Sequence, residues 1–282
     1  MKGLKSIFNL FSNSSSDSFD DIDYKCIVSS GRTGTQFFGQ FFDHFYENLI
    51  SRHEPRPDLF NIFIEKYRNK AGTEELVTFL RKDRLALVNE CRKSPSQVLI
   101  ESNPNASLLI PELKLTFPSH KFLWIVRDPK TYLKSAYSKS PDGSGEMMFY
   151  GENDHRDRLK PSDLTESENV DWDRFDRFQK ICWYWNAINK ILYSNLKDDN
   201  NCLMLRYEDL FSKEDNLHYL LKVLDFFELD HSEIDLDRVN SRMLVPSNQT
   251  KFSMIRSYDD WDKNKTDSFE ALTSEMRSIL NY

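Results

Sequence analysis

Four short apolar runs, each ended by polar residues, constrain the fold of this chain more than any other feature. They are YKCIVSS from Tyr24, SQVLIES from Ser96, KFLWIVR from Lys121 and NCLMLRY from Asn201. Apolar runs of this length, without regular polar alternation, are typical of strands that are covered on both faces of a parallel sheet. We therefore expect an α/β protein with three layers, in which helices cover both faces of a mostly parallel central sheet.

Six segments with the apolar spacing of helices follow or separate these runs. They cover residues 35–50, 73–93, 128–138, 173–197, 216–229 and 268–280. Apolar residues at intervals of three and four place one face of each helix against the sheet. Pro129 suits the first turn of the third helix, where a backbone N–H is not needed. The last helix is expected to be about ten residues long.

Two polar stretches lie outside this pattern. Residues 1–21 are rich in Ser and Asp, and the stretch SNSSSDSFDD buries too little apolar surface to become ordered, so we expect a flexible lead-in. Residues 140–171 are long, polar and punctuated by Gly and Pro, which in a compact domain is typical of a lid or a substrate-binding loop. Residues 22–282 show no further boundary and are expected to form a single domain.

Composition and charge narrow the class of function. The formal net charge of −7 argues against a broad nucleic-acid or anionic-membrane surface, so any anion site must be local. No apolar run approaches the roughly 18 residues that cross a bilayer, and a cytoplasmic location is expected. The four cysteines lack metal-binding spacing, and we expect them to be reduced.

The turn after the first apolar run, SSGRTGT at residues 29–35, has the features of an anion-binding loop. It contains the glycines Gly31 and Gly34, the hydroxyl residues Thr33 and Thr35, and Arg32. At the end of a parallel strand, such a turn offers backbone N–H groups at the positive end of a helix dipole. The glycines permit unusual backbone conformations, and the arginine adds a permanent charge. The alternative is an ordinary turn with an exposed arginine.

This loop is not a Walker A motif. It has neither the spacing between glycines nor the Gly-Lys-Ser/Thr ending whose hydroxyl binds magnesium. Metal-assisted chemistry on a nucleoside triphosphate is therefore disfavoured, and we expect no metal. Two alternatives stay open: a P-loop kinase with Asp128 as magnesium ligand, and a non-catalytic nucleotide-binding scaffold of the same fold.

A second anion site is indicated after the third apolar run. Arg127 stands at the end of that run, and Ser135 follows eight residues later in the next predicted helix. A residue two turns into the helix can lean back over the strand end, so the guanidinium and the hydroxyl can meet at a second phosphate. The alternative is a local ion pair between Arg127 and Asp128.

Taken together, these motifs resemble the family of sulfotransferases that use 3′-phosphoadenosine 5′-phosphosulfate (PAPS). The resemblance runs from about Tyr24 to about Leu229 and includes the later stretch LMLRYEDL. It implies a P-loop-like α/β fold without a metal, with PAP, the desulfated nucleotide, as product. It also implies donor-binding roles for Gly31, Arg32, Thr33, Gly34, Thr35 and Gln36 at the 5′-phosphosulfate, Arg127 and Ser135 at the 3′-phosphate, and Phe37 and Tyr207 at the adenine.

The resemblance also suggests catalytic residues. Arg32 would neutralise the charge that grows on the departing phosphate. Glu54, in the turn ISRHEPRPDLF, resembles the glutamate that serves as base in the carbohydrate- and protein-modifying branch. Its neighbour His53 is expected to point elsewhere, since adjacent residues of an extended turn point apart. Glu101 is the second candidate base, and Asn103 stands near the place of the histidine found in the phenol-type branch.

These inferences define the expected reaction and its open points. We expect sulfuryl transfer to a hydroxyl of a carbohydrate or glycan-bearing metabolite, with no membrane span and no nucleic-acid partner. Glu54 has an alternative role as a surface carboxylate that caps a helix or pairs with Arg52 or Arg56. Lys251 and Arg256 are further basic residues that could reach the 3′-phosphate.

Overall fold

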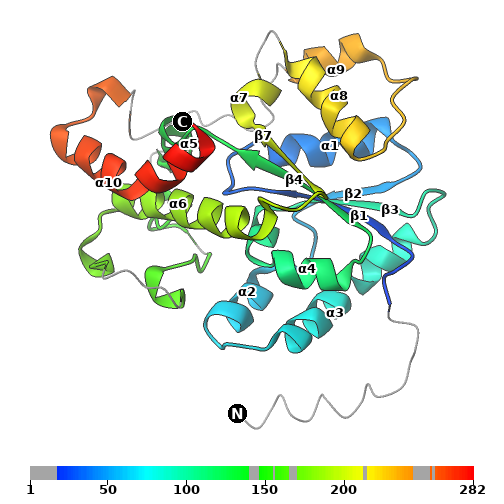
Figure 1. Ribbon diagram of the computed structural model, residues 1–282, viewed down its shortest axis with the longest axis horizontal. Coiled ribbons are helices and arrows are strands. Elements are labelled where there is room, and N and C mark those ends of the chain that lie inside the picture. The colour runs from blue at the N-terminus through cyan, green and yellow to red at the C-terminus, as the bar shows by residue number, and fades with distance from the viewer. Residues whose placement is uncertain are drawn as a thin grey trace.

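A five-stranded sheet forms the centre of the structure, and all of its neighbouring strands run parallel (Figure 1). The computed structural model describes residues 18–139, 146–154, 156–164, 170–211, 215–243, 255 and 258–282. The strand order is β2-β3-β1-β4-β7. The strands are β1 (Asp23–Val28), β2 (Ile50–His53), β3 (Val98–Ser102), β4 (His120–Val126) and β7 (Cys202–Arg206). The predicted α/β fold with a parallel sheet is confirmed.

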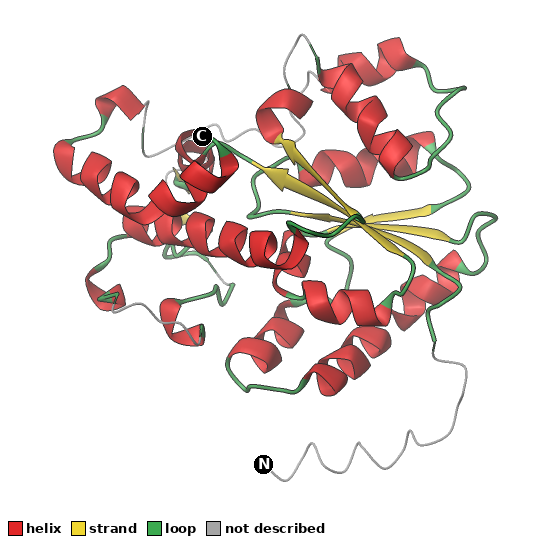
Figure 2. Ribbon diagram, in the orientation of Figure 1, coloured by secondary structure: helices red, strands yellow, loops and turns green. Residues whose placement is uncertain are grey.

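Helices cover both faces of this sheet, as Figure 2 shows. One face carries α1 (Thr35–Phe45), α7 (Tyr207–Leu210), α8 (Asn216–Phe226) and α9 (Leu236–Met243). The other carries α2 (Phe60–Tyr67), α3 (Thr73–Cys91), α4 (Ile110–Thr116), α5 (Pro129–Ala136), α6 (Arg177–Leu196) and α10 (Lys263–Leu280). Short 3-10 helices are η2 (Pro104–Leu108), η3 (Pro161–Asp163), η4 (Trp172–Arg174) and η5 (Tyr258–Asp260).

The central strand β1 shows why its sequence is an unbroken apolar run. Tyr24, Cys26 and Val28 pack into the core on the side of α3 and α6, whereas Ile27 packs into the core on the side of α1 and α8. Successive side chains of a strand point to opposite faces, so a strand covered on both faces needs apolar residues at nearly every position.

Strand β2 was not predicted from the sequence, which indicated a turn beside the first strand over residues 50–60. The structure corrects this prediction. Residues Ile50–His53 form an edge strand that pairs with β3 instead, with Arg52 opposite Glu101. This strand has only four residues, and only Ser51 is buried. An edge strand needs little apolar sequence, so its pattern does not stand out.

Other predicted segments differ from the structure in their bounds. Helix α1 ends at Phe45, before the predicted end at residue 50, and α10 is longer than expected because Asp262 caps it at Lys265. Within 140–171, the described residues include β6 (Glu146–Met147), which pairs antiparallel with β5 (Ser138–Lys139). Most of the predicted lead-in, together with Lys251 and Arg256, lies outside the described residues.

Two further expectations concern the cysteines and membranes. Cys26, Cys91 and Cys182 are buried free thiols, and Cys202 is a half-buried one. Over the described part of the chain, none of the helices combines the length and the apolar character that crossing a bilayer demands.

Candidate active site

A cavity of about 400 Å³ lies at the carboxyl ends of the five parallel strands. Each strand supplies lining residues at its end or just beyond it. They are residues 30–37 after β1, His53 and Glu54 at β2, Pro104 and Asn105 after β3, Arg127 after β4 and Tyr207 after β7. This is the edge at which open parallel sheets bind ligands. All of the predicted donor-binding residues line this one cavity.

The loop between β1 and α1 adopts a backbone conformation that depends on its glycines. Gly31 and Gly34 have φ angles of 87° and 78°, in the left-handed region. A Cβ atom at Gly34 would lie 2.5 Å from the ring of Phe211, so a side chain there is excluded by space as well as by φ. Gly34 also caps α1 without a side-chain hydrogen bond. The first N–H groups of α1 therefore suit an anion.

Hydroxyl groups beneath the loop hold its shape. The Ser29 hydroxyl accepts hydrogen bonds from the Gly31 N–H at 3.0 Å and from the Thr33 hydroxyl at 2.7 Å. The Ser29 N–H in turn donates to the Ser107 hydroxyl at 3.0 Å. Ser29 and Thr33 are fully buried. The loop is thus fixed before any ligand binds, which lowers the ordering cost of binding.

Arg32 and Ser135, which are far apart in the sequence, are in direct contact. The Arg32 Nε donates to the Ser135 hydroxyl at 2.9 Å, and Arg127 donates to the Arg32 carbonyl at 2.5 Å. Burial lowers the pKa of Arg32, and the nearby charge of Arg127 lowers it further. Burial also lowers the pKa of Arg127. Two desolvated guanidinium groups side by side are stabilised by a bound anion.

Arg127 is oriented by an aromatic ring and by the start of α5. Its guanidinium lies 4.2 Å from the centre of the Tyr207 ring, and its Nε donates to the Thr131 hydroxyl at 3.1 Å. Asp128 accepts from the N–H groups of Lys130 and Thr131 and so caps α5. This capping role accounts for Asp128, which the sequence analysis also considered as an ion-pair partner of Arg127.

Glu54 lines the cavity and forms an ion pair with a residue from a distant segment. Its carboxylate lies 3.0 Å from the Arg156 guanidinium. Arg52 and Arg56, the partners considered from the sequence, instead pair with Glu90 and Asp58.

His53 also lines the cavity, which corrects the expectation that only one of the two neighbours faces it. The φ angle of Glu54 is 44°, so the alternation of an extended chain is broken at this point. The Nδ1 of His53 lies 2.9 Å from the Ser102 carbonyl, which fixes the ring beside the end of β3.

Glu101, the second candidate base, is not among the residues that line the cavity. It is fully buried and receives two 2.8 Å hydrogen bonds from Arg84, one at each carboxylate oxygen. Asn103 and Tyr24 donate to the same carboxylate. Burial alone would raise the pKa of Glu101, but the Arg84 charge and these hydrogen bonds lower it below its usual value. Such a closed carboxylate has no free oxygen for a substrate, so its geometry argues against a role as base.

Comparison with known protein families gives a match to the sulfotransferase family over residues 26–233, well over half of the chain. The chain belongs to the sulfotransferase family. The matched region includes the loop after β1, Glu54, Arg127, Ser135 and Tyr207. This sulfotransferase is therefore an enzyme that transfers a sulfuryl group to an acceptor group such as a hydroxyl.

Solved structures share the fold of this sulfotransferase at low sequence identity. The sulfotransferase domain from the curacin biosynthetic pathway is 14% identical, with a TM-score of 0.51 over 93% of this chain and 98% of that domain. Mouse sulfotransferase SULT7A1 complexed with PAP is 17% identical, with a TM-score of 0.52 over 93% of this chain and 86% of the mouse chain. Sulfotransferase STF9 from Mycobacterium avium is 12% identical, with a TM-score of 0.51 over 92% and 76%. No curated protein matches the sequence.

Several residues of the sulfotransferase cavity were missed by the sequence analysis. They are Met148, Phe149, Arg156, Arg158, Tyr184, Phe211 and Met243. Four of them come from the polar stretch 140–171. We expected this stretch to form a lid or a substrate-binding loop, but its sequence has no pattern that identifies individual site residues. Phe211 had a usable signal, because it follows the YEDL turn by one residue and packs on Tyr207.

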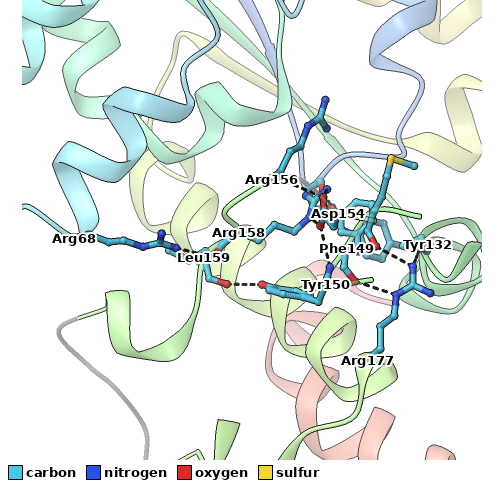
Figure 3. A network of polar contacts seen from close by, with 12 residues as sticks. Arg68, Tyr132, Phe149, Tyr150, Asp154, Arg156, Arg158, Leu159 and Arg177 are labelled. Atoms are coloured by element: carbon cyan, nitrogen blue, oxygen red, sulfur yellow. Dashed lines mark hydrogen bonds and ion pairs between the residues drawn. The ribbon is translucent and has the colours of Figure 1, made fainter. Parts of the chain in front are cut away.

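A polar network holds the described part of this stretch against α6 (Figure 3). Met148, Phe149 and Tyr150 all have left-handed φ angles, of 58°, 44° and 64°. Such angles cost on the order of 1 kcal/mol or more per residue. Arg177 of α6 offsets this cost by donating to the carbonyls of Met148 and Phe149 at 2.9 and 3.2 Å. The unusual turn places the Phe149 ring in the cavity wall.

Proposed function

We propose that this sulfotransferase transfers the sulfuryl group of PAPS to a hydroxyl of a carbohydrate or glycan-bearing metabolite. The observation that carries the proposal is that Arg32 contacts Ser135 and Arg127 at the start of α1, where no side chain forms a capping hydrogen bond. A donor with two separated phosphate groups suits this arrangement, because backbone N–H groups and two guanidinium groups face one cavity.

The loop residues and the aromatic residues have separate roles in donor binding. The N–H groups and hydroxyls of residues 31–36 would hold the 5′-phosphosulfate, and Arg127 with Ser135 would hold the 3′-phosphate. The adenine would lie against the aromatic group of Phe37, Tyr207 and Phe211, whose rings pack on one another. Ser135 would then exchange its present contact with Arg32 for a phosphate oxygen.

The proposed chemistry is an in-line displacement at sulfur. The acceptor hydroxyl gives its proton to the Glu54 carboxylate while its oxygen forms a bond to the sulfur. The bond between sulfur and the bridging oxygen breaks, and its electron pair leaves on the 5′-phosphate of PAP. Arg32 stabilises that growing negative charge, and the fixed loop holds the donor in line.

A transfer assay with labelled PAPS tests this proposal. The enzyme is incubated with a panel of sugars, lipids, phenols and peptides, and PAP binding is measured separately by calorimetry. We expect PAP to bind without added metal and the label to move to a sugar hydroxyl. Metal-dependent binding of ATP in place of PAP would instead favour the kinase alternative.

Arg32→Ala sharpens the assay. We expect turnover to fall about 10²- to 10³-fold, because a preorganised donor to the leaving group is lost, and PAP affinity to fall less. Arg206→Ala, outside the cavity lining, serves as the matched control. Unchanged transfer by Arg32→Ala would contradict the proposed role.

A further inference from the structure

Among the described residues, four arginines line the cavity, and they differ in what compensates their charge. Arg32 and Arg127 face the proposed donor phosphates. Arg158 is almost fully buried and pairs with the equally buried Asp154, which also accepts from the Tyr150 N–H at 2.9 Å. Its guanidinium lies 4.0 Å from the Phe149 ring centre, so its position is fixed. Arg156 is the exception, because its partner is the cavity residue Glu54.

Arg156 is more accessible than Arg158. Its side chain is 43% exposed, against 6% for Arg158, and that of Glu54 is 27% exposed. Figure 3 shows Arg156 extending away from the network that contains Arg158 and Asp154. An ion pair at this exposure contributes about 1 kcal/mol or less, so another carboxylate can replace Glu54 at Arg156.

The position of Arg156 separates it from the donor phosphates. Glu54 follows the edge strand β2, whereas Arg127 follows β4, and β3 and β1 lie between them. Three strand spacings of about 4.8 Å place the two strand ends about 14 Å apart. One cavity therefore presents positive charge at two places, with the loop after β1 in the middle.

The present ion pair also conflicts with the proposed role of Glu54. The Glu54 Oε2 atom already accepts a hydrogen bond from Arg156 at 3.0 Å, so this oxygen is not free to take the proton of an acceptor hydroxyl. When Glu54 takes a proton, Arg156 loses its counter-charge. A second carboxylate at Arg156 removes both difficulties, because it releases Glu54 and keeps the guanidinium paired.

We propose that Arg156 binds a carboxylate of the acceptor, so that the acceptor is an acidic sugar whose binding releases Glu54 from its ion pair. This inference rests on the proposed function and names its substrate class. Arg156 is then a specificity-determining residue that also positions the base. The structure already holds a carboxylate, that of Glu54, at the place where the acceptor carboxylate is proposed to bind.

Binding of two matched sugars to the PAP-loaded full-length enzyme tests this inference. Methyl β-D-glucuronide carries a carboxylate where methyl β-D-glucoside carries a hydroxymethyl group. We expect calorimetry to show about two- to fivefold tighter binding of the glucuronide, the range that an ion pair at this exposure gives. In Arg156→Gln this preference is expected to disappear. Arg174→Gln, a change at an arginine that is 87% exposed in the same region, is expected to keep it.

Each other outcome has a defined meaning. Equal binding of the two sugars, no binding of either, or a preference that survives in Arg156→Gln overturns the inference. A fall in acceptor-independent release of sulfate from labelled PAPS in Arg156→Gln also overturns it, because Arg156 would then serve the sulfuryl group. Failure of PAP itself to bind contradicts the proposed function instead.

Discussion

Two arginine–glutamate pairs lie at the ends of neighbouring strands, and their surroundings give them different roles. The side chains of Arg84 and Glu101 have no exposed surface, and two 2.8 Å hydrogen bonds join them. Glu54 and Arg156 keep 27% and 43% of their side-chain surface exposed and share one 3.0 Å contact. The first pair is part of the core, whereas the second lines the cavity.

The register of β2 and β3 explains this difference. Arg52 lies opposite Glu101, so Glu54 stands two residues further along the sheet. Its N–H donates to the Ser102 carbonyl, the last residue of β3. At Glu101 the chain is still covered by helices, and at Glu54 it has reached the cavity. Burial, rather than residue type, therefore separates the core carboxylate of Glu101 from that of Glu54, which lines the cavity.

Glu101→Ala is expected to have the largest effect on stability. It leaves the Arg84 charge buried without a partner, and the free energy of unfolding should fall by about 3–5 kcal/mol. Urea denaturation measures this change. The double variant Arg84→Met/Glu101→Met removes both charges at similar volume and should regain most of the loss. If the free energy of unfolding of the single variant falls by less than about 1 kcal/mol, the core pair does not stabilise the fold as proposed.

Glu54→Gln is expected to affect turnover instead of stability. Loss of the proposed base should lower turnover about 10²- to 10⁴-fold, whereas the free energy of unfolding should change by less than about 1 kcal/mol. The transfer assay and urea denaturation measure the two quantities, and PAP affinity is the control. Wild-type turnover in this variant would remove Glu54 from the mechanism.

The core pair should also make stability sensitive to acid. The folded state lowers the pKa of Glu101 below its usual range, so its carboxylate contributes stability above that range. The contribution is lost as the pH falls through the folded-state pKa. In denaturation series from pH 7 to pH 3, the wild type should lose more stability than Arg84→Met/Glu101→Met. If the free energy of unfolding of the two proteins fell equally with pH, Glu101 would not be the source of the acid sensitivity.

Arg52→Ala should have the smallest effect and completes the series. Arg52 pairs with Glu90 on the surface, where the two side chains are 37% and 45% exposed. Solvent screens this pair, so its loss should cost less than about 1 kcal/mol and leave turnover unchanged. If Arg52→Ala lowered the free energy of unfolding as much as Glu101→Ala, burial would not explain the difference between the ion pairs.

Much of the fold could be predicted because the central strands are apolar on both faces. The runs that became β1, β3, β4 and β7 each stood out in the sequence. Strand β2 did not, since its half-buried edge position requires no apolar run. Helix ends were also predicted less well, because they depend on single caps such as Asp262.

The donor side of the site could be predicted better than the acceptor side. The loop after β1, Arg127 and Ser135 follow strands at short, fixed distances in the sequence, and all of them line the cavity. Arg156 reaches Glu54 across about a hundred residues, through a turn held by Arg177. Contacts of this kind depend on side-chain packing and have no periodic signal in the sequence.

The sequence by itself determined the layered α/β fold and the position of the glycine-containing loop after β1, because both depend on local patterns of apolar residues and glycines. Only the tertiary structure decided which carboxylate faces the cavity. The family resemblance placed Glu54 before Glu101 as candidate base, but both glutamates stand at adjacent strand ends, and no local sequence pattern shows which of them is buried. Glu101 lies inside the core because Arg84 of helix α3 places its guanidinium beneath the sheet and pairs with the Glu101 carboxylate there.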